Sequence, residues 1–181
     1  MSTGSKSVAR SVPASMSIIV RPVRQEDYPT LRALDDAVMR YSARVFLGFD
    51  WDTAPEERRE ATRAITADSF GFYAGTGCSF AAEGGDALVG YVLAQPLRHF
   101  DLEPLAVWVE DISVHPDYHR RGVATALYRT LARWSQEHGA TVVLAGIHPD
   151  NAASLALHRR VGFTVHNTKT AVLALDSVED E

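Results

Sequence analysis

The sequence predicts a mixed α/β fold built around one central sheet. Residues 107–114 form a mostly apolar run rich in β-branched side chains, which is typical of a buried strand. A helix is predicted over residues 122–138, because its apolar side chains recur at helical spacing: Val123, Leu127, Leu131 and Trp134. Residues 141–147 form a further apolar strand. A strand, a helix and a strand in succession imply parallel pairing through a right-handed crossover.

The N-terminal part of the chain predicts a strand, a helix and an aromatic loop. The strand is expected over residues 18–23, and the helix over residues 25–40 with Asp35 and Asp36 on its solvated face. The aromatic loop spans residues 46–52. It either covers the edge of the core or forms a wall of a pocket for an acceptor substrate.

The remaining elements follow from capping and turn signals. Thr53 and Glu56 have the spacing of a capping box, which predicts a second helix with a charged, solvated face up to about Ala67. A hairpin is expected next, with strands at residues 78–82 and 87–95 and a turn at Gly84-Gly85-Asp86. A last helix and hairpin are expected over residues 151–161, 164–168 and 170–175. The predicted order is β-α-α-β-β-β-α-β-α-β-β.

Composition restricts the class of protein. The chain has 181 residues, 46% of them hydrophobic, which is enough for one domain with a proper core. A net charge of −5 argues against nonspecific nucleic-acid binding. The single cysteine, Cys78, excludes an internal disulfide framework and fits a reducing, cytoplasmic compartment. No apolar run reaches the roughly 18 residues that a transmembrane helix needs, so no membrane association is expected.

The two ends of the chain are expected to lie outside the folded domain. Residues 1–16 are Ser-rich, lack the apolar region of a secretory signal and are predicted to be disordered, and Met16 is a candidate for the true start. The domain is expected over residues 17–176, and residues 177–181 form an acidic tail.

The turn between residues 114 and 123 is the most informative motif. Pro116 ends the strand, and Gly122 at the start of the next helix lets a ligand approach the backbone closely. Free amides and the positive end of the helix dipole favour a phosphate or pyrophosphate there. Arg120 and Arg121 would add charge-assisted donors. The bland alternative is an ordinary loop with two solvated arginines.

Two further groups of polar residues are candidates for chemistry. Asn151, Ser154 and His158 share one face of an Ala- and Leu-rich helix, so either water or a ligand should lie beside them, or Asn151 only caps the helix. Glu110 and Asp111 interrupt an apolar strand, where a buried carboxylate is a candidate base with a raised pKa. Strand alternation places these two on opposite faces, and a bulge would swap them. The alternative is a structural ion pair with an arginine.

These motifs together resemble those of the GNAT superfamily of N-acetyltransferases. The acetyl-CoA signature of that family is Q/R-x-x-G-x-G/A; Gly122 and Ala124 match it, and His119 stands where Gln or Arg is usual. The helix that starts at Asn151 and ends in Gly162-Phe163 is similar to the second signature, nearest to the phosphinothricin and methionine sulfoximine N-acetyltransferases. The resemblance implies a central sheet of about six to seven strands with about four helices. It also implies that the strands at residues 107–114 and 141–147 splay apart.

The resemblance also implies a function. It predicts direct acetyl transfer from acetyl-CoA, without a metal, to a primary amine of an amino-acid-like or polyamine-like small molecule. The residues expected to bind acetyl-CoA are Ile112, Ser113, Val114, His119, Arg120, Arg121, Gly122, Val123, Ala124, Thr125, Asn151, Ser154 and His158. A homodimer is compatible with this family.

The catalytic assignments follow the family positions. Glu110 is the expected base, because the family commonly has Glu there. His158 stands where many members have a tyrosine that protonates the leaving thiolate. Cys78 has no neighbouring His or acid in the sequence, so a covalent acetyl-cysteine is not expected. The alternatives are a non-catalytic acyl-CoA-binding sensor and a protein or peptide N-terminal acetyltransferase.

Overall fold

The computed structural model describes residues 17–63, 65–99 and 102–167 of the chain. The structure divides into two compact units, Met1–Gly146 and Ile147–Glu181. The expected disordered segment at residues 1–16 and the acidic tail at residues 177–181 lie outside the described residues. Within the described part of the chain, no helix is both long and apolar enough to cross a membrane.

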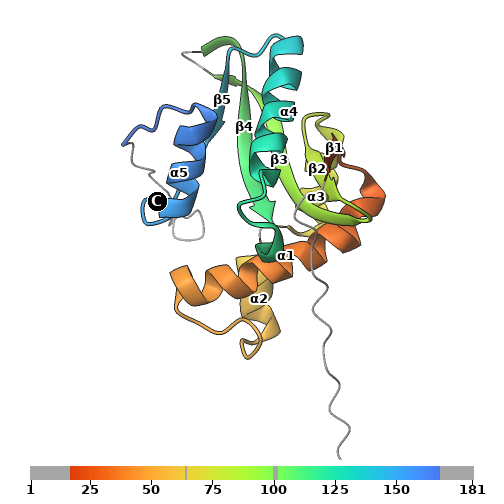
Figure 1. Cartoon of the computed structure of the whole chain (residues 1–181), viewed down its shortest axis with the longest axis vertical. Coiled ribbons are helices and arrows are strands. Elements are labelled where there is room, and N and C mark those ends of the chain that lie inside the picture. The colour runs from red at the N-terminus through yellow and green to blue at the C-terminus, as the bar shows by residue number, and fades with distance from the viewer. Residues whose placement is uncertain (1–16, 64, 100–101, 168–181) are drawn as a thin grey trace, which may run out of the picture. The chain divides into compact units, whose positions relative to one another are not determined.

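One five-stranded sheet forms the centre of the first unit (Figure 1). Its strands, in both spatial and chain order, are β1 (Ile18–Pro22), β2 (Phe80–Gly84), β3 (Ala87–His99), β4 (Leu102–Val114) and β5 (Val142–Ala145). The first three neighbouring pairs are antiparallel, and β4 pairs with β5 in parallel. The mixed sheet and its parallel pair are therefore confirmed.

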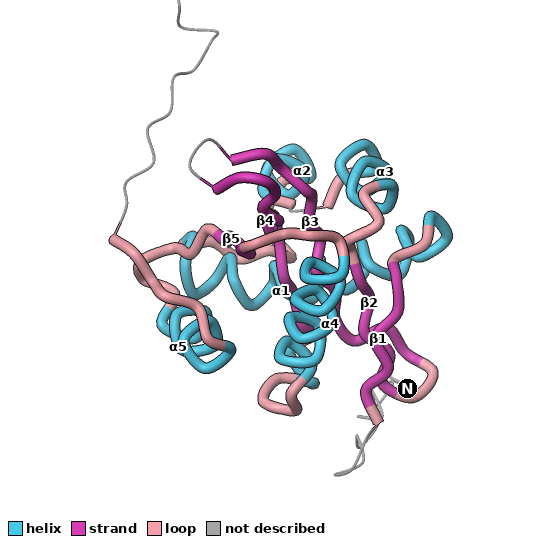
Figure 2. The backbone as a smooth tube through the Cα atoms, turned by 90° about the horizontal axis from the view of Figure 1, so that it is seen from above, coloured by secondary structure: helices cyan, strands magenta, loops and turns pink. Residues whose placement is uncertain are grey.

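Over the described residues, the sheet has fewer strands than the six to seven expected. The difference comes from the predicted final hairpin: residues 164–167 form no strand, and residues 168–175 lie outside the described part of the chain. The helices are α1 (Tyr28–Ser42), α2 (Glu56–Thr62), α3 (Ala67–Gly75), α4 (Val123–Glu137) and, in the second unit, α5 (Ala152–Val161). Figure 2 shows the strands of the first unit following one another across the molecule, with helices beside them.

The region between α1 and β2 differs from the prediction. The capping box at Thr53 is wrong, since α2 begins at Glu56 after Pro55, and the Thr53 hydroxyl instead donates to the carbonyl oxygen of Asp50. The helix also ends at Thr62 rather than near Ala67. A separate helix, α3, follows that the sequence reading missed. The sequence signal for the start of α3 is Thr66, the N-cap residue, which exchanges capping hydrogen bonds with Ser69.

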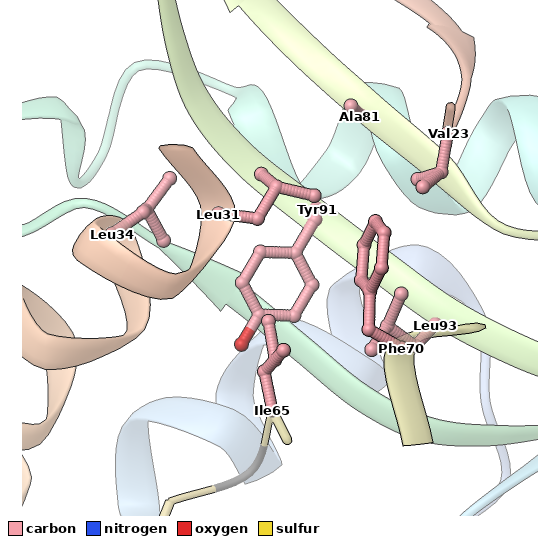
Figure 3. Packing of buried hydrophobic residues seen from close by; sticks show 8 residues of the cluster. All are labelled: Val23, Leu31, Leu34, Ile65, Phe70, Ala81, Tyr91 and Leu93. Atoms are coloured by element: carbon pink, nitrogen blue, oxygen red, sulfur yellow. The ribbon is translucent and has the colours of Figure 1, made fainter. Parts of the chain in front are cut away.

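One hydrophobic cluster of the described residues lies between the sheet and helices α1 and α3. Tyr91 and Leu93 of β3 point into it, and Figure 3 shows the Tyr91 ring among apolar side chains with its hydroxyl oxygen in red. The other buried members are Val23, Leu31, Leu34, Ile65, Phe70 and Ala81. Each fully buried large apolar side chain stabilises the fold by roughly 1.5–3 kcal/mol.

Helix α4 covers the opposite face of the sheet. Side chains alternate along β3, so Gly90 faces away from the cluster that contains Tyr91. A Cβ atom at Gly90 would lie 2.9 Å from a methyl carbon of Val123 and 2.9 Å from the carbonyl oxygen of Ser113. The absence of a side chain at Gly90 therefore lets the first turn of α4 sit directly on the end of β4.

The placement of Asp35 on a solvated face is wrong. Asp35 is fully buried, with 0% of its surface exposed. The physical reason is its position, because Asp35 follows Leu31 by four residues and Leu34 by one, and so falls within the apolar stripe of α1. Asp36 remains partly exposed and forms an ion pair with Arg63, at 3.0 Å.

The aromatic loop lies against two arginines. Trp51 is 2% exposed and Phe49 stacks beside it, with 6.3 Å between the ring centroids. The guanidinium of Arg58 lies 4.1 Å from the Phe49 ring centre, and that of Arg63 lies 5.4 Å from the Trp51 ring. These contacts agree with the interpretation in which the loop covers the edge of the core.

Candidate active site

The parallel strand β5 pairs with only part of the length of β4. They pair from Ala106 with Val142 to Val109 with Ala145, after which β5 ends while β4 continues to Val114. Over the described residues, no strand pairs with the last five residues of β4 on the β5 side. The structure thus confirms the splay expected from the sequence.

The free edge of β4 presents main-chain groups. The His115 amide donates to the carbonyl of Val89, so residues 113 and 111 also direct their main-chain groups toward β3. By the alternation of an antiparallel pair, Ile112 and Val114 direct theirs toward the open side. An extended ligand could add hydrogen bonds along this edge.

A β-bulge lies where the splay begins. Leu93 of β3 pairs with Asp111, but Ala94 pairs with Val109, so Glu110 is an extra residue without a partner on β3. The bulge brings both carboxylates to the face of the sheet that carries α1 and α3. The sequence expectation of opposite faces is therefore wrong, for the reason that a bulge breaks strict alternation.

Glu110 lies at the exposed side of this face. Its carboxylate accepts a hydrogen bond from Trp108 Nε1, at 3.0 Å, and lies near the hydroxyl of Tyr73 on α3. Partial burial and the charge of Glu110 raise the pKa of Tyr73 to about 12. The tyrosine therefore stays protonated and acts as a donor to Glu110 at neutral pH.

Asp111 lies deeper and contacts a different set of side chains. It is partly buried, accepts a hydrogen bond from the Ser113 hydroxyl at 3.1 Å, and lies near the hydroxyl of Tyr91. Loss of solvent raises the pKa of Asp111, and the hydrogen bonds from Tyr91 and Ser113 oppose this effect. The buried Asp35 lies on the far side of Tyr91, where burial and the charge of Asp111 raise its pKa to about 6.

Sequence reasoning missed Asp35 and Tyr91 as members of this site. The available signal was an acidic residue on the apolar stripe of a helix, at i+4 from Leu31. Such a residue must be paired or neutralised when the helix packs.

The turn after β4 has an unusual backbone. Arg120 has a φ of 63° and Gly122 a φ of 83°, both in the left-handed region. For Arg120 this conformation costs about 1–2 kcal/mol. Gly122 is the N-cap of α4 and offers no side-chain cap, so the first amides of the helix, from Val123 to Thr125, have no partner within the helix. Nothing lies within 4 Å of a Cβ atom built on Gly122, so the backbone here is accessible.

Side chains of the turn fold back onto the end of β4. His119 Nε2 lies 2.9 Å from the carbonyl oxygen of Val114, and its ring meets Tyr41 of α1 edge-on at 6.2 Å. The guanidinium of Arg121 lies 6.0 Å from the ring of Tyr118. The predicted turn, with its exposed Arg120, Arg121 and Gly122, is thus present as expected.

The second unit contains the other predicted residues. Asn151 caps α5 by accepting a hydrogen bond from the Ser154 amide at 3.0 Å. His158 is 2% exposed, and its Nδ1 lies 2.8 Å from the carbonyl oxygen of Ser154 and 3.3 Å from the Ser154 hydroxyl. Its ring packs edge-on against Phe163 at 5.0 Å. The three polar residues do lie together, and local hydrogen bonds account for much of their spacing.

Cys78 has the environment of a structural residue. It is fully buried, its thiol donates to the Thr76 hydroxyl at 3.5 Å, and burial raises its pKa. A thiol kept protonated in this way is a poor nucleophile. In the described part of the chain, no group of three or more His, Cys, Asp or Glu residues could hold a metal ion.

Comparison with known proteins gives one family and a set of partial relatives. A family model described as "Protein of unknown function (DUF1999)" matches residues 18–181. The L-methionine sulfoximine/L-methionine sulfone acetyltransferase of Salmonella typhimurium is 33% identical over 84 residues, 46% of this chain and 48% of that protein. An aminoglycoside N(6')-acetyltransferase type 1 of the same species is 31% identical over 90 residues, 47% of this chain and 61% of that protein. The chain thus spans about half the length of the curated relatives it matches.

A solved structure shows the fold over most of the chain. The PaiA N-acetyltransferase from Thermoplasma acidophilum, in complex with coenzyme A, superposes with a TM-score of 0.66 at 15% identity. The match covers 85% of this chain and 94% of that protein. The acetyltransferase fold expected from the sequence is therefore confirmed.

Proposed function

Because the chain belongs to the DUF1999 family and has the GNAT fold, we propose that it is an acetyl-CoA-dependent N-acetyltransferase. It transfers the acetyl group directly to a primary amine of a small molecule, either amino-acid-like or polyamine-like. The observation that carries this proposal is the splayed edge of β4, which leads directly into an open turn with left-handed Arg120 and Gly122.

The first unit offers a suitable site for the coenzyme. The free main-chain groups of Ile112 and Val114 are available to an amide-containing arm. The uncapped start of α4 and the two arginines before it suit a pyrophosphate. In this proposal the coenzyme is held by Ile112, Ser113, Val114, His119, Arg120, Arg121, Gly122, Val123, Ala124 and Thr125. Bound acetyl-CoA supplies an activated thioester.

Asn151, Ser154 and His158 of the second unit have fewer free polar groups for the coenzyme than the residues of the first unit. Asn151 and Ser154 already cap and brace α5, so only their remaining polar groups would contact the coenzyme. His158 is proposed as the acid that protonates the thiolate. If its Nδ1 keeps donating to the Ser154 carbonyl, His158 must carry a second proton, on Nε2, to act in this way.

The acceptor amine must lose a proton before it can attack the thioester. Glu110 and Asp111 at the bulge are the candidates for this base, and their charge would also attract the protonated amine. The family position points to Glu110. General-base catalysis of this kind contributes roughly 10²–10⁴-fold to the rate.

Two acceptor classes are favoured by the relatives. One relative acts on methionine sulfoximine and methionine sulfone, which are amino acids, and another on aminoglycosides. Both classes present a primary amine that is cationic at neutral pH. Because the matches span about half of each relative, the acceptor of this chain has to be found by experiment.

The test begins with binding. Titration calorimetry should show acetyl-CoA binding to the full chain, and Gly122→Glu should abolish it by placing bulk and negative charge beside the proposed pyrophosphate site. Thiol release with methionine sulfoximine, a polyamine, an aminoglycoside and a short peptide would then identify the acceptor. Absence of acetyl-CoA binding by the wild-type protein would overturn the proposal, and binding without turnover on any amine would favour the sensor alternative.

A further inference from the structure

Three polar side chains from three elements meet inside the first unit. They are Asp35 of α1, Tyr91 of β3 and Asp111 of β4. The Tyr91 hydroxyl lies 3.4 Å from Asp35 Oδ1, and Asp111 is near enough to raise the pKa of Tyr91 further, beyond the larger effect of burial. Asp35 and Tyr91 are fully buried, whereas Asp111 keeps part of its surface exposed. The cluster therefore has an outer end at Asp111 and an inner end at Asp35.

The number of protons in this cluster follows from its contacts. A tyrosine hydroxyl has one proton, so Tyr91 can donate to only one of the two carboxyl groups at a time. The other contact becomes a hydrogen bond only when a carboxyl group donates a proton of its own. Both contacts can be hydrogen bonds when one of the two carboxyl groups is protonated. The cluster then holds one proton in addition to that of the Tyr91 hydroxyl.

Asp35 is the deepest place for that proton. Its Oδ1 contacts Tyr91, and the nearby amide of Ile65 opposes, without cancelling, the rise in the pKa of the carboxyl group. Its Oδ2 is buried and has no hydrogen-bond partner among the described residues. A buried carboxylate with one unpaired oxygen is costly when ionised, and protonation removes that cost.

The surrounding charges act in the same direction. The strongest charged neighbours of Asp35 are Asp111 and Asp36, and Glu110 acts on Asp111 from the same strand. From the opposite face, Tyr128 of α4 also responds to the charge of Asp111. Asp111, Asp36 and Glu110 are negative when ionised, so each disfavours a further negative charge in the cluster, whereas Tyr128 has a raised pKa and stays neutral.

We propose that Asp111, Tyr91 and Asp35 form a proton relay, in which Asp111 takes a proton from the acceptor's ammonium group and Asp35 stores it. This inference rests on the proposed N-acetyltransferase function. The ammonium N–H bond breaks, its electron pair stays on nitrogen, and an O–H bond forms on Asp111. That proton passes to the Tyr91 oxygen while the tyrosine's own proton passes to Asp35. Tyr91 ends unchanged, and the proton returns to solvent by the reverse path.

The relay assigns the base to Asp111 in place of Glu110, the residue that the family position favours, and gives Glu110 a different role. Glu110 is the more exposed and is oriented by Trp108 and Tyr73, which suits it to attract the cationic amine. Asp111 has a second carboxyl group behind it, reached through Tyr91. Only Asp111 can therefore lose a newly acquired proton to the interior while the substrate still covers its outer side.

The kinetic test compares two variants with a matched control. Asp35→Asn and Tyr91→Phe each break the relay at close to constant shape, and Asp36→Asn changes the next residue of α1, which pairs with Arg63 instead. With methionine sulfoximine, or the best amine of the panel, the first two should lower kcat about tenfold or more and leave acetyl-CoA affinity unchanged. Asp36→Asn should keep the wild-type kcat.

The pH dependence of kcat/KM gives a signature that a structural role would not. Removing the negative charge of Asp35 lowers the pKa of Asp111, so Asp35→Asn should move the acid limb to lower pH. Removing the Tyr91 hydroxyl takes away a hydrogen bond that holds the pKa of Asp111 down, so Tyr91→Phe should move the limb to higher pH. Wild-type kcat and pH profiles in both variants would overturn the relay while leaving the acetyltransferase proposal intact.

A measurement without substrate separates the relay from the proposed function. In the protein labelled with ¹³C at its aspartate carboxyl groups, NMR should show one carboxyl that titrates near pH 6 and a second that responds to the same titration. Loss of the first signal in Asp35→Asn would assign it. If the variants do not fold, the wild-type spectrum alone decides: ordinary acidic titration of every aspartate would overturn the inference.

Discussion

Replacing Asp35 by asparagine should stabilise the folded protein at neutral pH. In the wild type, the side chain is fully buried, and burial together with the charge of Asp111 raises its pKa from 3.8 to about 6. The native state therefore binds this proton more tightly than the unfolded state does. The stability that the Asp35 carboxyl group contributes is therefore fully present below about pH 4, is lost as pH rises through about 6, and is absent above that. Asparagine has no such proton to lose.

The size of the effect follows from the pKa difference. A change from 3.8 to about 6 is about two pH units, which at 1.36 kcal/mol per unit corresponds to about 3 kcal/mol. The free energy of unfolding of Asp35→Asn minus that of the wild type should therefore rise by up to about 3 kcal/mol between pH 4 and pH 8. A constant offset of about 1 kcal/mol can be added by the altered hydrogen bond with Tyr91.

The assay is urea unfolding at several pH values across this range. Asp36→Asn serves as the control, because its carboxylate is partly exposed and pairs with Arg63, so its removal should give a small loss with little pH dependence between 5 and 8. A difference between Asp35→Asn and wild type that stays constant with pH would refute the reasoning. It would mean that Asp35 is ionised in the native state as easily as in the unfolded chain.

Three further predictions concern the other parts of the site. Gly122→Ala has open space but an unfavourable φ of 83°, so it should cost about 1–2 kcal/mol in thermal unfolding. Calorimetry should show that Gly122→Ala still binds acetyl-CoA, in contrast to the loss expected for Gly122→Glu. Gly90→Ala forces a Cβ atom to 2.9 Å from Val123 and should destabilise the fold by about 1–3 kcal/mol, and a wild-type melting temperature would contradict this. His158→Ala should lower kcat with unchanged acetyl-CoA affinity, and His158→Tyr should extend activity to alkaline pH; unchanged pH–kcat profiles in both would assign His158 a packing role.

The parts of the fold that the sequence predicted are those set by local pattern. The apolar run of β4, the turn at Pro116 and the amphipathic α4 are each determined by residues close together in the chain. The same is true of α5, where Asn151 and Gly162 cap the two ends. The expected phosphate-binding turn could be located for this reason, since its backbone follows from its own residues.

The parts that were missed depend on contacts distant in sequence. The bulge at Glu110 appears only when β4 is paired with β3, because the extra residue is defined by its missing partner. Helix α3 is short. The sequence pattern of α2 predicted a helix up to about Ala67, which hid the separate start of α3 at Thr66. Burial of Asp35 required knowing that α1 packs its Leu31 and Leu34 stripe against Tyr91.

These misses have a common physical origin, and it bears on function. An apolar side chain at position 35 would fit the buried apolar face of α1, yet the chain has an acid there with one unpaired oxygen. With a native-state pKa of about 6, ionising Asp35 at neutral pH costs about 3 kcal/mol, a large share of the roughly 5–15 kcal/mol that holds a domain folded. The bulge at Glu110 likewise interrupts a strand pairing in order to turn two carboxylates to one face. Both departures from the most stable local choice meet at Asp111 through Tyr91, which is where the proposed reaction needs an acceptor for a proton.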